Sequence, residues 1–261
     1  MKNQIFNEIN IVTMKRMGNS SIDGIITSPP YNISKKRKDN YYNTGYSELD
    51  NLTSEEYLKV RVNEFKEFSR ILKNKGVICY NISYMHENPI LPILLITKIH
   101  EETDLTIADI IYWKKNSSIP FQTSPNKLSR IVEPIYIFVH KDNLSDFKAN
   151  KEISKQNERT GQLFYKKYDN YIEAKNNDGY KSTLKAVYSV ELIKKLIHIY
   201  YPKGSVIYDP FMGSGTTALG CIEEGISYVG SEMKDEHYKT SLNRINLLKK
   251  DIHVEKINLI K

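Results

Sequence analysis

A polar and aromatic corner, Ser28-Pro29-Pro30-Tyr31, follows a short apolar run from Gly24 to Ile26. Each proline lacks a backbone N–H and fixes its own φ angle, so neither a helix nor a central strand can continue through it. The Ser28 hydroxyl and the Pro29 carbonyl can accept hydrogen bonds from an amino group, and Tyr31 offers a ring for stacking. The alternative is a simple proline turn closed by a packed tyrosine. The residue types therefore predict either a rigid clamp for an amino-bearing ring or a plain turn.

A second distinctive stretch is VIYDPFMGSGTTALG, residues 206–220. We expect a strand to end at Asp209, a tight turn at Gly213 and Gly215, and a helix to begin near Thr216. Glycine lets the backbone approach a ligand closely, and a helix start offers free N–H groups. Glu232 follows the next expected strand, where a carboxylate can accept hydrogen bonds from a ribose diol. The pattern indicates a site for an adenosine-containing ligand.

Four interpretations of this glycine turn compete. No lysine follows Gly215, which nearly excludes a phosphate-binding P-loop. The spacing G-x-G-x-x-A matches a dinucleotide site only weakly, and a turn without any ligand is also compatible. A carboxylate at Asp209 would repel a pyrophosphate, but it suits a ligand that carries an ammonium and a sulfonium. We therefore favour S-adenosylmethionine.

Together the two stretches resemble the amino-methylating DNA methyltransferases. Ser28-Pro29-Pro30-Tyr31 is similar to their catalytic motif, [Asp/Asn/Ser]-Pro-Pro-[Tyr/Phe], and residues 209–215 look like their cofactor motif, Phe-x-Gly-x-Gly. The catalytic motif comes first in this chain, an order that resembles the β subgroup. The chain departs from the family at Ser189, where proline is usual, and at Asn7-Glu8, where Gly-Asp is usual.

The resemblance implies a reaction and a substrate. Family members transfer a methyl group from S-adenosylmethionine to an exocyclic amine of a base that is flipped out of duplex DNA. In the family, serine at the first motif position tends to accompany cytosine N4 and aspartate adenine N6. Ser28 therefore favours cytosine N4, with an N6-adenine DNA methyltransferase as the alternative. More distant alternatives are an RNA or protein-glutamine methyltransferase and a non-catalytic nucleic-acid-binding module.

The resemblance also assigns roles to particular residues. Catalysis falls to Ser28, Pro29, Pro30 and Tyr31. Cofactor binding falls to Glu8, Thr27, Asp209, Pro210, Phe211, Gly213, Ser214, Gly215, Thr216 and Glu232. Basic side chains are the candidates for DNA contacts, namely Lys35, Lys36, Arg37, Lys38, Arg159, Lys166 and Lys167. For the first four, a solvated basic loop is the alternative. Expected partners are double-stranded DNA, a second copy of the chain and a cognate restriction endonuclease, as in a restriction–modification system.

Apolar strands and amphipathic helices alternate around these motifs. Helical spacing predicts helices over 53–73, 89–102, 190–200, 216–224 and 236–249, with Thr53 or Ser54 capping the first. Strands are predicted over 77–82, 105–113, 130–139, 206–208 and 228–230, besides the one that enters the Ser28 corner. This alternation predicts an α/β fold with a largely parallel sheet. The resemblance makes it a Rossmann-like methyltransferase fold, with helices on both faces and a circularly permuted motif order.

We expect one core in two halves and an insert. Residues 1–140 form the catalytic half and residues 184–261 the cofactor-binding half. Apolar periodicity fades over 141–183, where Lys, Asn, Asp and Tyr dominate, so we interpret this segment as a target-recognition insert.

Bulk composition limits the function classes. With 261 residues and 40% hydrophobic content the chain can bury a sizeable core, and no window is long and apolar enough for a membrane span. The net charge of +7 suits a polyanionic partner, although an A·T-rich genome would also raise the lysine content.

Neither Cys79 nor Cys221 follows a proline, which argues against cytosine C5 methylation. Two cysteines also make no convincing disulfide framework or zinc site, so we expect a cytoplasmic protein without a metal.

Overall fold

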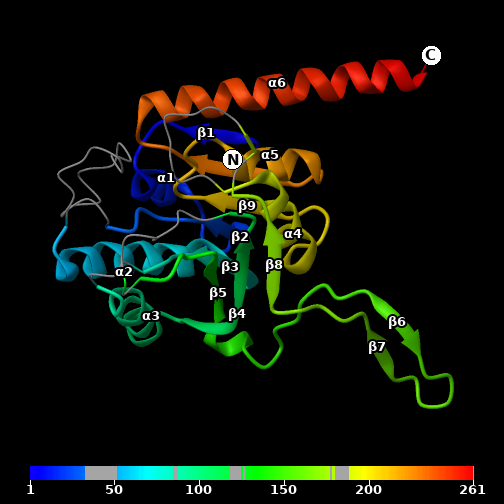
Figure 1. The fold of residues 1–261 in the computed structure, drawn as a ribbon, viewed down its shortest axis with the longest axis horizontal. Helices are drawn as coiled ribbons and strands as arrows, with labels where there is room; N and C mark the ends of the chain where they lie inside the picture. Colours follow the sequence, from blue (N-terminus) through cyan, green and yellow to red (C-terminus); the bar gives the residue numbers. More distant parts are fainter. Residues whose placement is uncertain are drawn as a thin grey trace.

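The computed structural model describes residues 1–32, 52–84, 88–117, 125, 127–176, 178–179 and 188–260, with side chains up to residue 252. Its centre is an eight-stranded sheet in the order β1-β10-β9-β2-β3-β5-β4-β8 (Figure 1). The strands are β1 (Gln4–Phe6), β2 (Ile22–Thr27), β3 (Leu72–Asn81), β4 (Leu105–Lys115), β5 (Val132–His140), β8 (Tyr171–Ala174), β9 (Val206–Asp209) and β10 (Ser227–Ser231). All neighbouring pairs are parallel except the two that involve β5, so β5 alone among these eight runs the opposite way.

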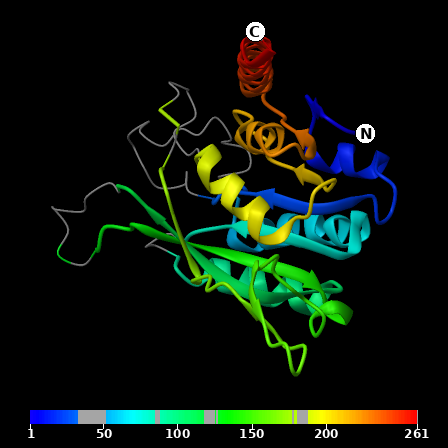
Figure 2. The ribbon, with the colours of Figure 1, turned by 90° about the vertical axis from the view of Figure 1, so that its right-hand side faces the viewer.

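Helices cover both faces of the sheet, as the sequence predicts (Figure 2). The helices are α1 (Asn10–Arg16), α2 (Ser54–Ile71), α3 (Leu91–Glu102), α4 (Val190–Tyr200), α5 (Thr216–Glu223) and α6 (Asp235–Ile260). One core cluster joins the sheet to α1, α2 and α3, and the other joins it to α4, α5 and α6. Alternate residues of a strand serve the two clusters, because successive side chains point to opposite faces. In β2, for example, Ile25 belongs to the first cluster and Ile26 to the second.

Local sequence explains the best-predicted helices. Thr53 caps α2 in a capping box, in which its side chain accepts a hydrogen bond from the Glu56 N–H and the Glu56 carboxylate accepts one from the Thr53 N–H. Ser189, the residue that replaces the usual proline, caps α4 by accepting a hydrogen bond from the Leu192 N–H at 3.4 Å. The helices predicted over 53–73, 89–102, 190–200 and 216–224 are confirmed within about two residues at each end. Helix α6 is longer than predicted, and β1 and α1 have no counterpart in the sequence analysis.

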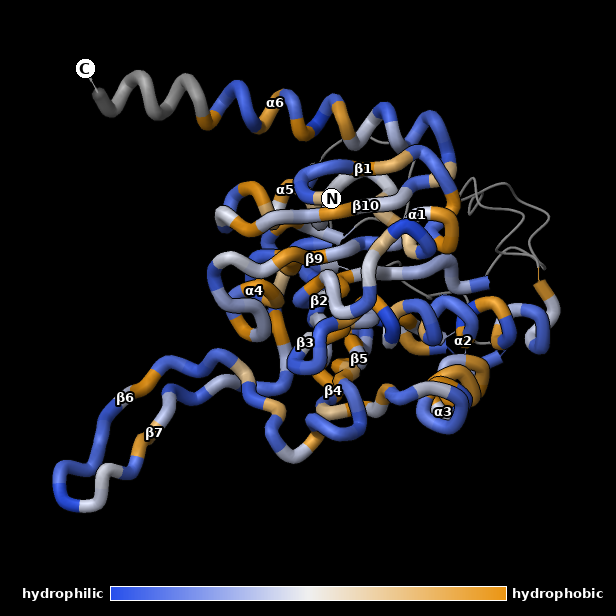
Figure 3. Tube along the Cα trace, turned by 180° about the vertical axis from the view of Figure 1, so that it is seen from behind, coloured by the Kyte–Doolittle hydropathy of each residue, from blue (hydrophilic) through white to orange (hydrophobic). Residues whose placement is uncertain are grey.

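Residues 141–176 contain two different structures. A short 3₁₀ turn, η3 (Lys141–Asn143), is followed by the two-stranded hairpin of β6 (Ile153–Gln156) and β7 (Leu163–Tyr165). We call residues 153–165 the hairpin arm. The arm projects away from the body (Figure 1), and Figure 3 shows it as mostly hydrophilic, with a few hydrophobic positions. The strand β8 instead pairs with β4 and is the outermost strand of the main sheet on that side.

The parallel strands β1, β10, β9, β2 and β3 all end at the same edge of the sheet, which we call the carboxyl edge. Ligands of open parallel sheets bind at this edge. The hairpin arm leaves from the opposite edge. There, the Lys141 N–H donates to the carbonyl of Asp104, just before β4, and the Asn150 N–H donates to the carbonyl of Ile199, near the end of α4.

Candidate functional site

The two motifs of the sequence meet at the carboxyl edge. The Thr27 hydroxyl at the end of β2 donates to Asp209 Oδ1 at the end of β9 over 2.7 Å, although 182 positions separate the two residues. Strands β2 and β9 are adjacent and parallel, which brings their ends together. The Ser28-Pro29-Pro30-Tyr31 corner therefore starts directly beside the glycine turn.

Asp209 organises the turn from inside the protein. Its side chain is fully buried and accepts four hydrogen bonds. The donors are the hydroxyls of Thr27 (2.7 Å), Thr217 (2.6 Å) and Tyr188 (3.1 Å) and the N–H of Phe211 (3.0 Å). Burial raises the pKa of Asp209, and these hydrogen bonds oppose that rise. The carboxylate thus fixes the turn geometry, and its direct contact with a ligand cation stays a prediction.

The glycine turn has the backbone that the sequence predicts. Gly213 and Gly215 have positive φ angles of 53° and 87°, and Gly215 is the N-cap of α5. A Cβ at Gly215 would lie 2.9 Å from the Ser241 Cβ of α6, so only glycine fits there. Both requirements hold the turn in one conformation against α6.

Arg244 of α6 is a residue that sequence reasoning missed. Its guanidinium donates to the carbonyl (3.0 Å) and hydroxyl (2.9 Å) oxygens of Ser214 and to Thr216 Oγ1 (3.2 Å), and it pairs with Asp178 (3.0 Å). The side chains of Ser214 and Thr216, both predicted to bind the cofactor, face this arginine. No local signal marks Arg244, since it lies 30 residues after Ser214 and meets the turn only in the fold.

Glu232 lies beside the turn, at the end of β10. Its carboxylate is buried and accepts the N–H groups of Gly213 and Lys234, both at 2.8 Å. Asn7 at the end of β1 donates its side-chain amide to the Glu232 carbonyl at 2.9 Å. The carboxylate of Glu232, which is predicted to bind a ribose, is therefore held against the glycine turn.

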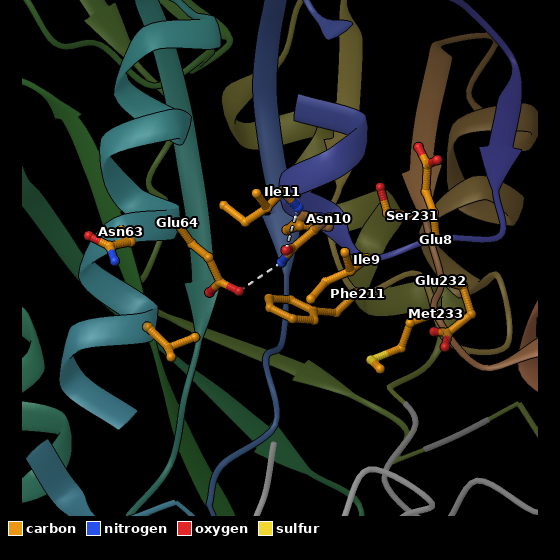
Figure 4. Close-up of a pocket in the computed structure, with 12 residues that line it drawn as sticks. Glu8, Ile9, Asn10, Ile11, Asn63, Glu64, Phe211, Ser231, Glu232 and Met233 are labelled. Carbon is orange, nitrogen blue, oxygen red and sulfur yellow. Dashed lines mark hydrogen bonds between the residues drawn. The ribbon is translucent and has the colours of Figure 1, made fainter. Parts of the chain in front are cut away.

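A pocket of about 200 Å³ opens next to Glu232 (Figure 4). Its lining comes from the ends of β9 and β10 and the residues that follow them, the segment between β1 and α1, the start of α1, and one face of α2. The lining residues are Glu8, Ile9, Asn10, Ile11, Val60, Asn63, Glu64, Pro210, Phe211, Ser231, Glu232 and Met233. Of the predicted cofactor residues, Glu8, Pro210, Phe211 and Glu232 are among them. The carboxylate of Glu8 accepts a hydrogen bond from Thr13 (2.6 Å) and pairs with Arg16.

Buried polar groups of α1 and α2 support Phe211. The Arg61 guanidinium is fully buried, lies 5.0 Å from the centre of the Phe211 ring and pairs with Glu64 Oε2 at 3.1 Å. Asn10 donates to Glu64 Oε1 at 2.8 Å. Burial raises the pKa of Glu64, while Arg61 and Asn10 oppose the rise. No local pattern in the sequence marks this set, because Arg61 and Glu64 lie on an otherwise apolar face of α2 and Asn10 lies on α1.

The corner itself is held by hydrogen bonds from several elements. Ser28 Oγ and the Tyr31 hydroxyl lie 2.9 Å apart, and the Tyr31 hydroxyl also reaches Asn81 Oδ1 (3.1 Å) at the end of β3. Tyr57 of α2 donates to the Pro30 carbonyl at 2.9 Å. Asn32 follows with a φ of 61°, a conformation that asparagine tolerates, and its side chain exchanges two hydrogen bonds with the backbone of Leu52. The corner is thus rigid beyond its prolines.

Of the predicted DNA contacts, the described residues include only Arg159, Lys166 and Lys167. Lys35, Lys36, Arg37 and Lys38 lie outside the described residues. Arg159 lies in the hairpin arm, and Lys166 and Lys167 follow it directly. Lys166 pairs with Glu152, and Lys167 pairs with Asp169 at 2.9 Å. Because the arm leaves from the opposite edge, a DNA role for these three residues stays a prediction.

The described part of the chain gives little support for a cysteine nucleophile or a metal site. Burial raises the pKa of the Cys79 thiol to about 12 and also raises that of Cys221, so neither is poised as a nucleophile. Among the described residues, no three His, Cys, Asp or Glu side chains cluster in a way that would hold a metal ion. No helix in the same residues is long and apolar enough to cross a membrane.

Comparison with known proteins identifies the family. The profile of the N6/N4 DNA methylase family matches residues 22–243, most of the chain. The chain belongs to this family of DNA methylases. The methylase is similar to the type II methyltransferase M.ScaI of Streptomyces caespitosus, with 22% identity over 89% of this chain and 77% of that protein. A local match to M.XycI of Xanthomonas campestris pv. cyanopsidis has 40% identity over 55 residues, which are 21% of this chain and 18% of that protein.

Solved structures share the fold of the methylase. The PvuII cytosine-N4-specific DNA methyltransferase superposes with a TM-score of 0.70 at 20% identity, over 92% of this chain and 84% of that chain. A putative DNA modification methylase of Thermus thermophilus in complex with S-adenosyl-L-methionine gives a TM-score of 0.64 at 16% identity, over 94% and 93% of the two chains. The methylase therefore has the Rossmann-like α/β methyltransferase fold.

Proposed function

We propose that this methylase transfers a methyl group from S-adenosylmethionine to the N4 amine of a cytosine in duplex DNA. The hydrogen bond from Thr27 to Asp209 carries the proposal, because it joins a rigid acceptor corner to a glycine turn at one edge. A cofactor held by the turn and a base held by the corner then meet at the ends of β9 and β2. The activity of the type II relatives supports a place in a restriction–modification system.

The residues around the pocket suit S-adenosylmethionine. A volume of about 200 Å³ with apolar walls from Ile9, Pro210, Phe211 and Met233 accommodates a flat adenine ring. Glu232 accepts hydrogen bonds from ribose hydroxyls, and the negative charge of Asp209 lies behind the turn where a sulfonium and an ammonium approach. When bound, the cofactor supplies an electrophilic methyl group.

The corner prepares the amine for attack. The lone pair of an exocyclic amine is delocalised into the ring, so catalysis must localise it and aim it at the methyl group. Ser28 Oγ and the Pro29 carbonyl accept the two N–H groups and thereby fix the orientation of the amine. Tyr57 and Asn32 hold the backbone on either side of Tyr31 in place. The target base must leave the duplex to reach this edge.

The choice of cytosine N4 rests on Ser28 and is supported by the cytosine-N4 specificity of the PvuII methyltransferase, whose fold is similar. An N6-adenine specificity on the same scaffold is the alternative. We further propose that residues 1–140 and 184–261 form the two halves of the core, that the insert 141–183 contributes to target recognition, and that the partners are double-stranded DNA, a second copy of the chain and a cognate restriction endonuclease.

The test uses the purified chain, methyl-labelled S-adenosylmethionine and unmethylated bacterial genomic DNA, followed by mass analysis of the digested nucleosides. We expect N4-methylcytosine. N6-methyladenine would retain the DNA methyltransferase but overturn the cytosine assignment. Label in RNA or protein with none in DNA would overturn the substrate class. The Ser28→Ala variant is the matched control, and it should lose most of the label while still binding the cofactor.

A further inference from the structure

The Ser28 hydroxyl is subject to a constraint that the carboxylate of an aspartate would not have. A carboxylate is only an acceptor, whereas a serine hydroxyl carries a proton and can donate as well as accept. If that proton pointed at the substrate amine, the hydroxyl would bind the lone pair that must attack the methyl group. The proton of Ser28 must therefore be directed elsewhere. The following inference rests on the proposed function of the corner.

Asn81 at the end of β3 provides a fixed acceptor. Its side-chain N–H donates to the Pro134 carbonyl of β5 at 3.0 Å, and this bond turns Oδ1 in the other direction. A flipped amide would place two acceptor oxygens against each other. Oδ1 lies 3.1 Å from the Tyr31 hydroxyl, and the Asn81 carbonyl lies 3.3 Å from it. Both oxygens can only accept.

Tyr31 has a single hydroxyl proton, and it donates that proton to the oxygens of Asn81. The remaining contact of the Tyr31 hydroxyl, with Ser28 Oγ at 2.9 Å, can then only be one that Tyr31 accepts. Ser28 must be the donor, so its proton points at Tyr31. Burial raises the pKa of Tyr31 well above its ordinary value, with Glu133 adding to the rise, so the phenol keeps its proton at working pH.

We propose that Asn81 and Tyr31 are positioning residues that hold the Ser28 proton away from the substrate and leave the Ser28 lone pairs to accept the amine N–H. The order of donation runs from Ser28 to Tyr31 to Asn81, while Asn81 itself is oriented by Pro134. Tyr31 thus acts through its hydroxyl, a role that its ring could not fulfil by stacking on the base. These hydrogen bonds orient the protons of Ser28 and Tyr31 without transferring them, and no covalent bond is made or broken among the three residues.

The test compares Tyr31→Phe, Asn81→Leu and, as matched control, Tyr57→Phe. Tyr57→Phe also removes one tyrosine hydroxyl that contacts the corner, but this hydroxyl donates to the Pro30 carbonyl and does not reach Ser28. Tyr31→Phe keeps the ring and should slow single-turnover methyl transfer about tenfold, the usual scale of one lost hydrogen bond. Asn81→Leu should slow it less, because the backbone carbonyl of residue 81 still accepts. Dissociation constants for cofactor and for duplex DNA should stay within about twofold of the parent.

A second background isolates the role of the proton. In the Ser28→Asp variant the carboxylate carries no proton that must be directed away from the amine. Adding Tyr31→Phe to this variant should therefore lower the rate of methyl transfer at most about twofold. Adding Tyr57→Phe should lower the rate by the same factor whether residue 28 is serine or aspartate. An equal tenfold loss from Tyr31→Phe in both backgrounds would overturn the inference. If Ser28→Asp has no measurable turnover, the single variants decide.

Two other outcomes also decide against the inference. A Tyr31→Phe rate within twofold of the parent would show that the hydroxyl is dispensable. A weakened DNA affinity that accounts for the whole loss would assign the Tyr31 hydroxyl to DNA binding instead. Failure of the parent chain to methylate DNA at all is a distinct result, since it overturns the proposed function and this inference with it.

Discussion

At the residue scale, one hydrogen bond links the catalytic corner to the glycine turn. Thr27 is buried and donates to a carboxylate that is itself buried, so this bond is charge-assisted and cannot be replaced by water. Asp209 accepts four hydrogen bonds from within the protein and thereby organises the turn, while its contact with a cofactor stays a prediction.

The variant Thr27→Val should therefore destabilise the protein and weaken the site. Loss of a bond to a charged acceptor costs about 1.5–3 kcal/mol, which urea unfolding would detect. We also expect weaker S-adenosylmethionine binding by calorimetry. The control is Thr106→Val at the start of β4, whose hydroxyl lies 3.1 Å from His100 at the opposite edge. A Thr27→Val protein with parent-like cofactor affinity would contradict the link between bond and site.

At the element scale, helix α6 supports the glycine turn. Ser241 packs on Gly215, and Arg244 holds Ser214 and Thr216. The sequence predicts α6 as a helix, yet nothing local indicates that it touches the turn. The helix supports the turn through tertiary contacts, namely the packing of Ser241 and the hydrogen bonds of Arg244.

Two glycine variants separate backbone strain from this packing. Gly215 and Gly225 both have positive φ angles, 87° and 66°, but a Cβ at Gly225 meets nothing within 4 Å. Gly225→Ala should cost only the left-handed backbone penalty, about 1 kcal/mol. Gly215→Ala should cost clearly more and should weaken cofactor binding, as measured by thermal unfolding with and without S-adenosylmethionine. Equal losses in the two variants would show that the contact with α6 contributes nothing.

At the scale of the whole molecule, the hairpin arm stands apart from the core. The side chains of both its strands are exposed, and the arm leaves from the edge opposite the site. An isolated two-stranded hairpin contributes little stability of its own. The side chains of the arm are therefore available for a contact with DNA or protein.

Replacing residues 154–164 by a short glycine-containing turn should leave the melting temperature and the cofactor affinity nearly unchanged. If the insert contributes to target recognition, the affinity for duplex DNA should fall several-fold, as measured by a binding titration at fixed salt. The companion variant Arg159→Ala, which removes one predicted DNA contact at the tip, measures how much of that fall comes from a single charge. Parent-like DNA affinity after the replacement would restrict target recognition to other segments.

The sequence by itself determined the local features of this methylase. Pro29 and Pro30 fix a corner, the glycines fix a turn, and Thr53 starts a helix, because each depends on backbone preferences of neighbouring residues. The motif pair also sufficed to recognise the family and the fold class.

Only the tertiary structure decided how these features act together. It revealed that Asp209 accepts four hydrogen bonds from the protein, that Arg61 pairs with Glu64 and lies against Phe211, and that Asn81 lies within hydrogen-bond distance of the Tyr31 hydroxyl. These contacts join residues that are tens to hundreds of positions apart, and the order of strands in the sheet sets them. The number of hydrogen bonds that a side chain makes, and the direction in which it points, depend on all of its neighbours in space. No local pattern in the sequence encodes them.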